Sequence, residues 1–243
     1  KPFINVSEVA YAGIASPGVC NREAATVEYS CNLPFHHFEI GKEFMRHLAV
    51  PKVYVENDAN AAALAEALAG AARGTKNSVM ITLGTGVGGG IIIDGKVYSG
   101  FNFAGAELGH IVIEHGGRPC SCGRKGCWEA YSSATGLINM TKEKLAECEK
   151  KGVHTLMADI AAEKGKVNGR TAFLALDKGD EAAKEVIDEY VSYLACGLAN
   201  IINIFQPEVV SIGGGISNEG QRLIDMLDPL VKAETYGGGG VKA

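Results

Sequence analysis

The stretch GHIVIEHGGRPCSCGRKGCWEA, residues 109–130, places three cysteines within eight positions, and two histidines precede them. The cysteines are Cys120, Cys122 and Cys127, and the histidines are His110 and His115. Three thiolates and one imidazole make up a closed structural zinc site, and soft sulfur ligands favour zinc over magnesium or calcium. Two glycines between the last two cysteines would let the sulfurs converge. The stretch therefore predicts a zinc loop. The spacing leaves open which histidine binds, and the alternative is three reduced thiols crowded on a loop.

Two glutamates flank this predicted zinc loop. Glu107 lies three residues before His110, and Glu129 lies two residues after Cys127. A spacing of three places Glu107 and His110 on one side of a helical turn. A metal in the loop would therefore fix two carboxylates in one neighbourhood, and paired carboxylates accept hydrogen bonds well from sugar hydroxyls. For each glutamate taken alone, a solvated surface charge is the ordinary alternative.

The composition narrows the class of protein. The 243 residues are 47% hydrophobic and 21% charged, which is typical of a globular domain. A net charge of −5 without a block of basic residues argues against a nucleic-acid surface. No apolar run approaches the ~20 residues of a membrane span, and the first residues lack the pattern of a signal peptide. The four cysteines outside the loop are scattered, which argues against a disulfide framework. We expect a cytoplasmic α/β protein.

Strand and helix patterns alternate along the chain. Strands are expected at 52–55, 78–83, 90–93 and 208–212, with an Asp-Gly hairpin turn at 94–95. An alanine-rich helix is expected at 59–70, mostly helical structure at 129–170, and a further helix at 221–230. Apolar residues recur at helical spacing from Glu181 until Pro207 ends that helix. This alternation favours the α/β class.

Two glycine clusters lie at strand ends. The first, GTGVGGG at 84–90, matches G-x-G-x-x-G formally, but a strand follows it, whereas a dinucleotide site requires a helix. No Gly-Lys-Ser/Thr follows either, so it is not a Walker A loop. What remains is a tight turn whose backbone N–H groups and Thr85 hydroxyl could face a phosphate, or else a plain glycine-rich hairpin. The second cluster, GGG at 213–215, stands between a strand and a helix. Together they favour phosphate binding.

The stretch VENDANAAALAEALAG, residues 55–70, joins a strand to a helix through Glu56, Asn57 and Asp58. Asn and Asp are preferred helix N-caps, so Asp58 could simply cap the helix. A carboxylate at the carboxyl end of a strand could instead accept a proton from an attacking hydroxyl, as the catalytic aspartate of kinases does. Position alone favours neither.

These motifs stand in one order along nearly the whole chain. They are GIASPG at 13–18, ENDANAAA at 56–63, LGTGVGGGIIIDGKVYSG at 83–100, AGAELGH at 104–110, CSCGRKGCWE at 120–129 and GLANIINIFQPEVVSIGGGIS at 197–217. In this constellation the chain resembles the ROK family of sugar kinases and repressors, and within it the bacterial glucokinases. The resemblance implies an actin-like ATPase (ribonuclease H-like) fold with two lobes and a cleft. Residues 1–56 would be the remnant of the smaller lobe, and 57–243 the larger lobe.

The resemblance also implies a role for individual residues. Asp58 looks like the base that takes the proton of the sugar 6-hydroxyl. The sugar ligands would be Gly18, Asn57, Asp58, Glu107, His110 and Glu129. The structural zinc ligands would be His110, Cys120, Cys122 and Cys127. The phosphate loop would contain Gly84, Thr85, Gly86 and Gly88, and the adenosine loop Gly213, Gly214 and Gly215.

The activity that the resemblance implies is transfer of the γ-phosphate of ATP, with Mg²⁺, to a hexose, with glucose first. Kinases for N-acetylmannosamine, N-acetylglucosamine or fructose use nearly the same polar set, and polyphosphate is a further possible donor. A sugar-responsive repressor of the same family is the alternative from another class. Family kinases begin with an Asp-x-Gly-Gly-Thr loop and end with a helix that these residues lack, and we expect both outside them. The family further implies a homodimer or larger assembly.

Overall fold

The computed structural model describes residue 5 and residues 8–30 and 33–237. The chain divides into two compact units. Unit 1 contains Lys1–Met80 and Gly89–Glu107, and unit 2 contains Ile81–Gly88 and Leu108–Ala243. This division does not coincide with the lobe boundary expected after residue 56, which stays a prediction.

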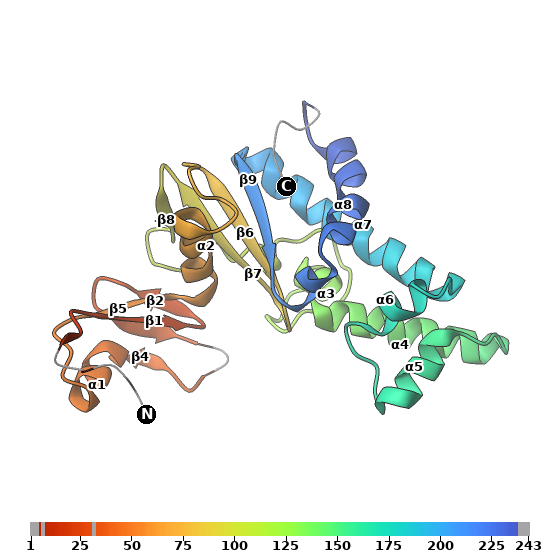
Figure 1. The fold of residues 1–243 in the computed structure, drawn as a ribbon, viewed down its shortest axis with the longest axis horizontal. Coiled ribbons are helices and arrows are strands. Elements are labelled where there is room, and N and C mark those ends of the chain that lie inside the picture. Colours follow the sequence, from red (N-terminus) through yellow and green to blue (C-terminus); the bar gives the residue numbers. More distant parts are fainter. Residues whose placement is uncertain (1–4, 6–7, 31–32, 238–243) are drawn as a thin grey trace. The chain divides into compact units, whose positions relative to one another are not determined.

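Unit 1 contains two small sheets. Strand β1 (Ala12–Ser16) pairs in parallel with β5 (Val53–Asn57), with Ser16 opposite Asn57. Strands β2 (Val19–Asn21), β3 (Thr26–Tyr29) and β4 (His36–Phe38) form an antiparallel sheet in that order. Helix α1 (Ile40–His47) follows them in the chain (Figure 1). The buried core of this part consists of Cys20, Val27, Val50, Val53 and Val55.

Helix α2 (Asp58–Ala69) follows β5 directly and ends at Gly70, as the sequence predicts. It packs closely on Gly90 of strand β7, where an added Cβ would lie 2.5 Å from the Ala63 methyl group and 2.7 Å from the Ala59 carbonyl oxygen. Small residues on both sides therefore bring the helix and the strand together.

A four-stranded sheet has the order β8–β7–β6–β9. Its strands are β6 (Ser78–Leu83), β7 (Val87–Ile93), β8 (Lys96–Tyr98) and β9 (Val209–Gly213). The Asp-Gly hairpin is confirmed, because β7 and β8 pair antiparallel and both turn residues have positive φ, 50° at Asp94 and 73° at Gly95. Strand β7 begins three residues earlier than expected, with Val87 buried, so the glycine turn shrinks to residues 84–86.

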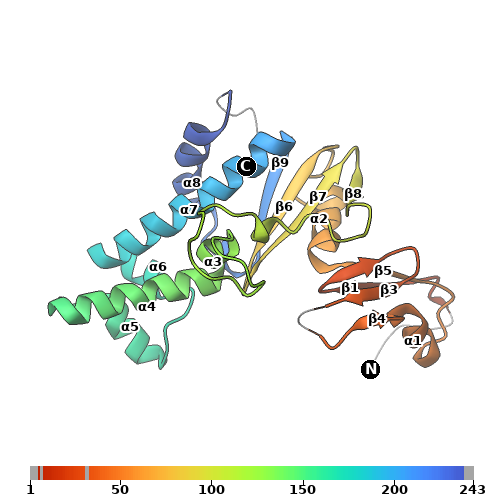
Figure 2. The ribbon, with the colours of Figure 1, turned by 180° about the vertical axis from the view of Figure 1, so that it is seen from behind.

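Unit 2 is mainly helical (Figure 2). Its helices are α3 (Glu129–Ser132), α4 (Ala134–Lys151), α5 (Leu156–Lys164), α6 (Thr171–Leu176), α7 (Glu181–Phe205) and α8 (Gln221–Glu234), with the 3₁₀ turns η2 (Leu108–His110) and η3 (Gly215–Glu219). The long helix α7 packs against α4, α6 and α8, and its buried face forms the centre of the unit. It ends before Pro207, as expected. Within the described part of the chain, no helix is long and apolar enough to cross a membrane.

Gly197 of α7 makes room for the indole of Trp128, which is fully buried. A Cβ at Gly197 would lie 2.0 Å from Trp128 Cε2, in the body of the ring. We expect Gly197→Ala to lower the free energy of unfolding by about 1–3 kcal/mol, because either the indole or the helix must shift. Thermal unfolding followed by circular dichroism measures this loss. Gly169→Ala, whose added Cβ would meet only ordinary contacts at 3.6 and 3.8 Å, is the control. Equal melting temperatures for the two variants would contradict the steric argument.

Candidate functional site

The turn between β5 and α2 is organised by Asn57. This residue is the N-cap of α2, and its Oδ1 accepts hydrogen bonds from the backbone N of Ala59 at 2.9 Å and of Asn60 at 3.1 Å. Its Nδ2 donates to the carbonyl oxygen of Gly18 at 3.1 Å. The structure thus brings together Gly18 and Asn57, two of the residues expected around a sugar.

Asp58 is the first residue of α2, not its cap. The capping alternative for Asp58 is wrong, because Asn57 fills that role. The Asp58 side chain is exposed, and its Oδ1 accepts a hydrogen bond from the backbone N of Ala59 at 3.0 Å. The Asp58 carboxylate therefore lies at the junction of a strand and a helix without serving as the helix cap.

Glu56 holds this turn from the other side. Its Oε1 accepts hydrogen bonds from the backbone N of Asn57 at 3.0 Å and from Nδ2 of Asn60 at 3.2 Å. Its Oε2 pairs with Arg22 at 3.8 Å. Sequence reasoning assigned no role to these contacts, because Glu56 in the sequence is simply a turn residue beside Asn57. In the structure it restrains the backbone that carries Asp58.

The first glycine loop, residues 84–86, is held by the start of helix α4 in unit 2. Its own turn closes with a hydrogen bond from Gly84 N to Gly86 O at 3.0 Å. The Gly84 carbonyl accepts from Ala134 N at 2.8 Å, and the Thr85 carbonyl accepts from the Thr135 hydroxyl at 2.7 Å. The carbonyls of the loop thus point to α4. Gly88, expected in the loop, lies inside strand β7.

The second glycine loop lies beside the first. Gly213 ends β9, Gly214 has a φ of 87°, and Gly215 begins η3. An added Cβ at Gly214 would lie 2.5 Å from the carbonyl oxygen of Leu83, the last residue of β6. Because β6 and β9 are neighbours in the sheet, the two loops expected to bind phosphate and adenosine leave adjacent strand ends.

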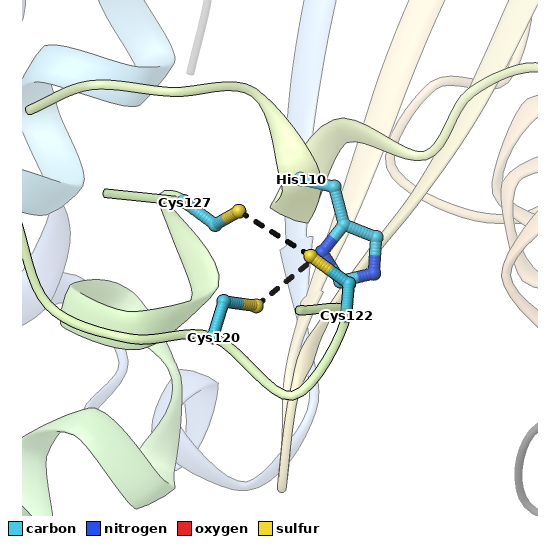
Figure 3. A group of neighbouring side chains, drawn as sticks. All are labelled: His110, Cys120, Cys122 and Cys127. Carbon is cyan, nitrogen blue, oxygen red and sulfur yellow. Dashed lines mark hydrogen bonds between the residues drawn. The ribbon is translucent and has the colours of Figure 1, made fainter. Parts of the chain in front are cut away.

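Four side chains of unit 2 form a cluster suited to a metal ion (Figure 3). The ligand atoms of His110, Cys120, Cys122 and Cys127 all lie within 4.8 Å of one another. The sulfurs of Cys122 and Cys127 are 3.6 Å apart, and Cys120 Sγ is 3.7 Å from His110 Nδ1. A tetrahedral ion with bonds of ~2.3 Å to sulfur requires edges of roughly 3.8 Å, so the cluster has the right size. His110 joins the sulfurs and His115 does not.

The loop that carries the cluster is tightly folded. Isolated β-bridges join Val112 to Cys127 and Pro119 to Lys125. Gly126 has a φ of 78°, and an added Cβ there would lie 1.7 Å from the Glu114 carbonyl oxygen. Burial raises the pKa of the Cys127 thiol to about 12, so the thiolate form needs a cation beside it. The cysteines among the described residues are free thiols.

Glu129, the first residue of α3, contacts both the metal loop and the glycine loop. Its Oε2 accepts a hydrogen bond from Val87 N at 3.0 Å, and its Oε1 accepts from the Ser121 hydroxyl at 3.2 Å and from the Cys120 thiol at 3.7 Å. Glu107 is exposed, directly precedes η2 and belongs to unit 1. The common neighbourhood expected for the two glutamates stays a prediction.

Comparison with known proteins gives one family. The sequence profile of the ROK family matches residues 4–238. A glucokinase of Thermotoga maritima is 41% identical over 221 residues, which are 90% of this chain and 68% of that protein. The crystal structure of a ROK family glucokinase from Streptomyces griseus, in complex with glucose and AMPPNP, superposes with a TM-score of 0.83 at 32% identity, over 97% of this chain and 75% of that one. A xylose repressor of Bacillus subtilis is 28% identical over 224 residues, 92% of this chain and 53% of the repressor. These likenesses confirm the expected actin-like α/β fold.

Proposed function

Because this chain belongs to the ROK family, we propose that it is an ATP-dependent hexose kinase whose acceptor is glucose. The observation that carries the proposal is the intact Asn57–Asp58 pair at the end of β5, in a chain 41% identical to a glucokinase. A related structure with 32% identity contains glucose and the ATP analogue AMPPNP, which match the proposed acceptor and donor. The product would be a hexose 6-phosphate, a substrate for glycolysis.

In the proposed mechanism the hexose is held by Asn57, Glu107, His110 and Glu129, with its 6-hydroxyl directed at the γ-phosphate. Asp58 accepts the hydroxyl proton as the bond from the sugar oxygen to the γ-phosphorus forms and the bond from that phosphorus to the β-phosphate oxygen breaks, which releases ADP. The two glycine loops place backbone N–H groups near the phosphates and leave no side chain in the way. Magnesium, when bound with ATP, neutralises charge on the phosphates.

A zinc ion fits the cluster of His110 and the three cysteines, and we assign it a structural role. His110 and the three cysteines would fill all four positions of a tetrahedral ion, which would leave no open position for a substrate. The ion would hold the loop before Glu129 in shape and would take no part in the transfer itself.

The xylose repressor relative supports a second candidate, a sugar-responsive repressor. The kinase has the better support for two reasons. The repressor is 28% identical to this chain whereas the glucokinase is 41% identical, and this chain keeps the complete GTGVGGG loop together with the Asn57–Asp58 pair.

The test is a coupled assay of ADP formation with the whole natural protein and a panel of sugars: glucose, N-acetylmannosamine, N-acetylglucosamine and fructose. We expect glucose to give the highest kcat/KM with ATP as donor. A parallel series with polyphosphate identifies the donor. Sugar binding measured by calorimetry without any phosphorylation of the panel would contradict the kinase and favour the repressor.

A further inference from the structure

The carboxylate of Glu129 is shared between two loops of unit 2. Oε2 accepts a hydrogen bond of 3.0 Å from the backbone N of Val87, the residue directly after the glycine loop. Oε1 accepts a hydrogen bond of 3.2 Å from the hydroxyl of Ser121, which stands between two cysteines of the metal loop. Because each loop is bound by a different oxygen of one rigid, planar group, a rotation that improves one contact disturbs the other.

The glycine loop also fits Glu129 sterically. A Cβ at Gly86 would lie 2.3 Å from Glu129 Oε2, so the carboxylate rests directly against the backbone of the loop. The backbone of Glu129 is restrained as well, because the preceding residue, Trp128, is fully buried and its Nε1 donates a hydrogen bond to the Tyr193 carbonyl at 3.1 Å. The conformational freedom that remains is that of the Glu129 side chain, and the hydrogen bond from Ser121 restrains it.

Ser121 is exposed, and its hydroxyl reaches Glu129 from the metal loop. The other group at Oε1 is the sulfur of Cys120 at 3.7 Å. It is a weak donor as a free thiol and no donor at all as a metal-bound thiolate. A hydroxyl bound to a charged carboxylate makes a stronger hydrogen bond. Ser121 is therefore the main restraint on the orientation of this oxygen.

We propose that Ser121 is a positioning residue that orients the Glu129 carboxylate and so couples the hexose site to the phosphate loop. Oε2 accepts the hydrogen bond from the backbone N–H of Val87. Ser121 holds Oε1 in the orientation in which it would accept a hydrogen bond from the sugar. A shift of the metal loop then changes the affinity for both substrates, because both depend on one side chain. The coupling of substrates rests on the proposed kinase function, whereas the positioning of Glu129 does not.

The positioning is tested without any substrate, by NMR hydrogen exchange of the Val87 amide in the whole, metal-loaded protein. We expect Ser121→Ala to speed this exchange about three- to tenfold, because the restraint on the acceptor of that N–H is lost. Glu129→Ala should speed it further, and Ser121→Thr, which keeps a hydroxyl, should restore the wild-type rate. Ser192→Ala, an exposed serine of α7, is the matched control and should change nothing. A wild-type exchange rate for Val87 in Ser121→Ala would overturn the proposal.

The coupling is tested by calorimetry with glucose and with magnesium AMPPNP. Ser121→Ala should raise both Kd values about three- to tenfold, and in the Glu129→Ala background it should change neither, since it acts through Glu129. A rise for glucose alone would refute the coupling and leave Ser121 as a sugar-site residue only. If the wild-type protein binds neither ligand, the kinase function fails, and the Val87 exchange still decides the positioning.

Discussion

Asp58→Asn should lower kcat for hexose phosphorylation by about 10²–10⁴-fold, the usual contribution of a general base. The amide keeps the shape of the carboxylate but cannot accept the hydroxyl proton. Helix α2 should be undisturbed, because its cap is Asn57. We therefore expect the Kd for glucose, measured by calorimetry, to stay within about threefold of wild type. The effect should thus appear in kcat and not in binding.

The matched control for this substitution is Asp159→Asn. Asp159 is also an exposed aspartate in the first turn of a helix, α5, and lies in the other unit. It should leave both kcat and the Kd for glucose unchanged. Normal turnover in Asp58→Asn would remove Asp58 from the mechanism, and equal losses of turnover and binding would make it a structural residue.

Replacing Cys127 should have large effects on the zinc content and on the affinity for glucose. This side chain is fully buried and contributes one of four clustered ligand atoms. In Cys127→Ala we expect the zinc content, measured by elemental analysis, to fall from about one ion per chain to near zero, because a three-ligand site binds zinc far more weakly. The Kd for glucose should rise by about tenfold or more, because the loop that positions Glu129 loses the metal ion that holds it in shape.

Cys148→Ala separates metal loss from loss of a buried thiol. Cys148 is a buried cysteine of α4 outside the cluster. We expect this variant to keep its zinc and its affinity for glucose, with only a modest loss of stability. Full zinc occupancy in Cys127→Ala would show that the cluster is not the zinc site. Unchanged glucose affinity in zinc-free, folded protein would break the link between the metal and Glu129.

The regular elements follow from local sequence patterns. Helix α7 combines long helical periodicity with a stop at Pro207, and it ends where the pattern predicts. The end of α8 is different, because the helix continues through Pro229 to Glu234, beyond the expected residue 230. Leu223 and Leu227 are buried and α8 packs along α7, so tertiary contacts outweigh the lost backbone hydrogen bond.

In the candidate site, too, some features follow from the sequence and others depend on tertiary contacts. The ligand types of the metal cluster follow from the cysteine spacing, which leaves both His110 and His115 open. The resemblance to the ROK family points to His110, and in the structure the bridge of Val112 to Cys127 brings the chain back so that His110 joins the sulfurs. The contacts of Glu129 with Ser121 and Val87 join three separate segments of the sequence. No local pattern reports such contacts, because they arise only when the loops are packed together.

The buried indole next to Glu129 gives this protein an optical reporter. Trp128 is the only tryptophan of the 243 residues, it is shielded from water, and it directly precedes the carboxylate that joins the two loops. Its fluorescence emission should therefore lie toward the blue end of the tryptophan range. A red shift or a change in quenching would mark a rearrangement of this one region, observed without any label.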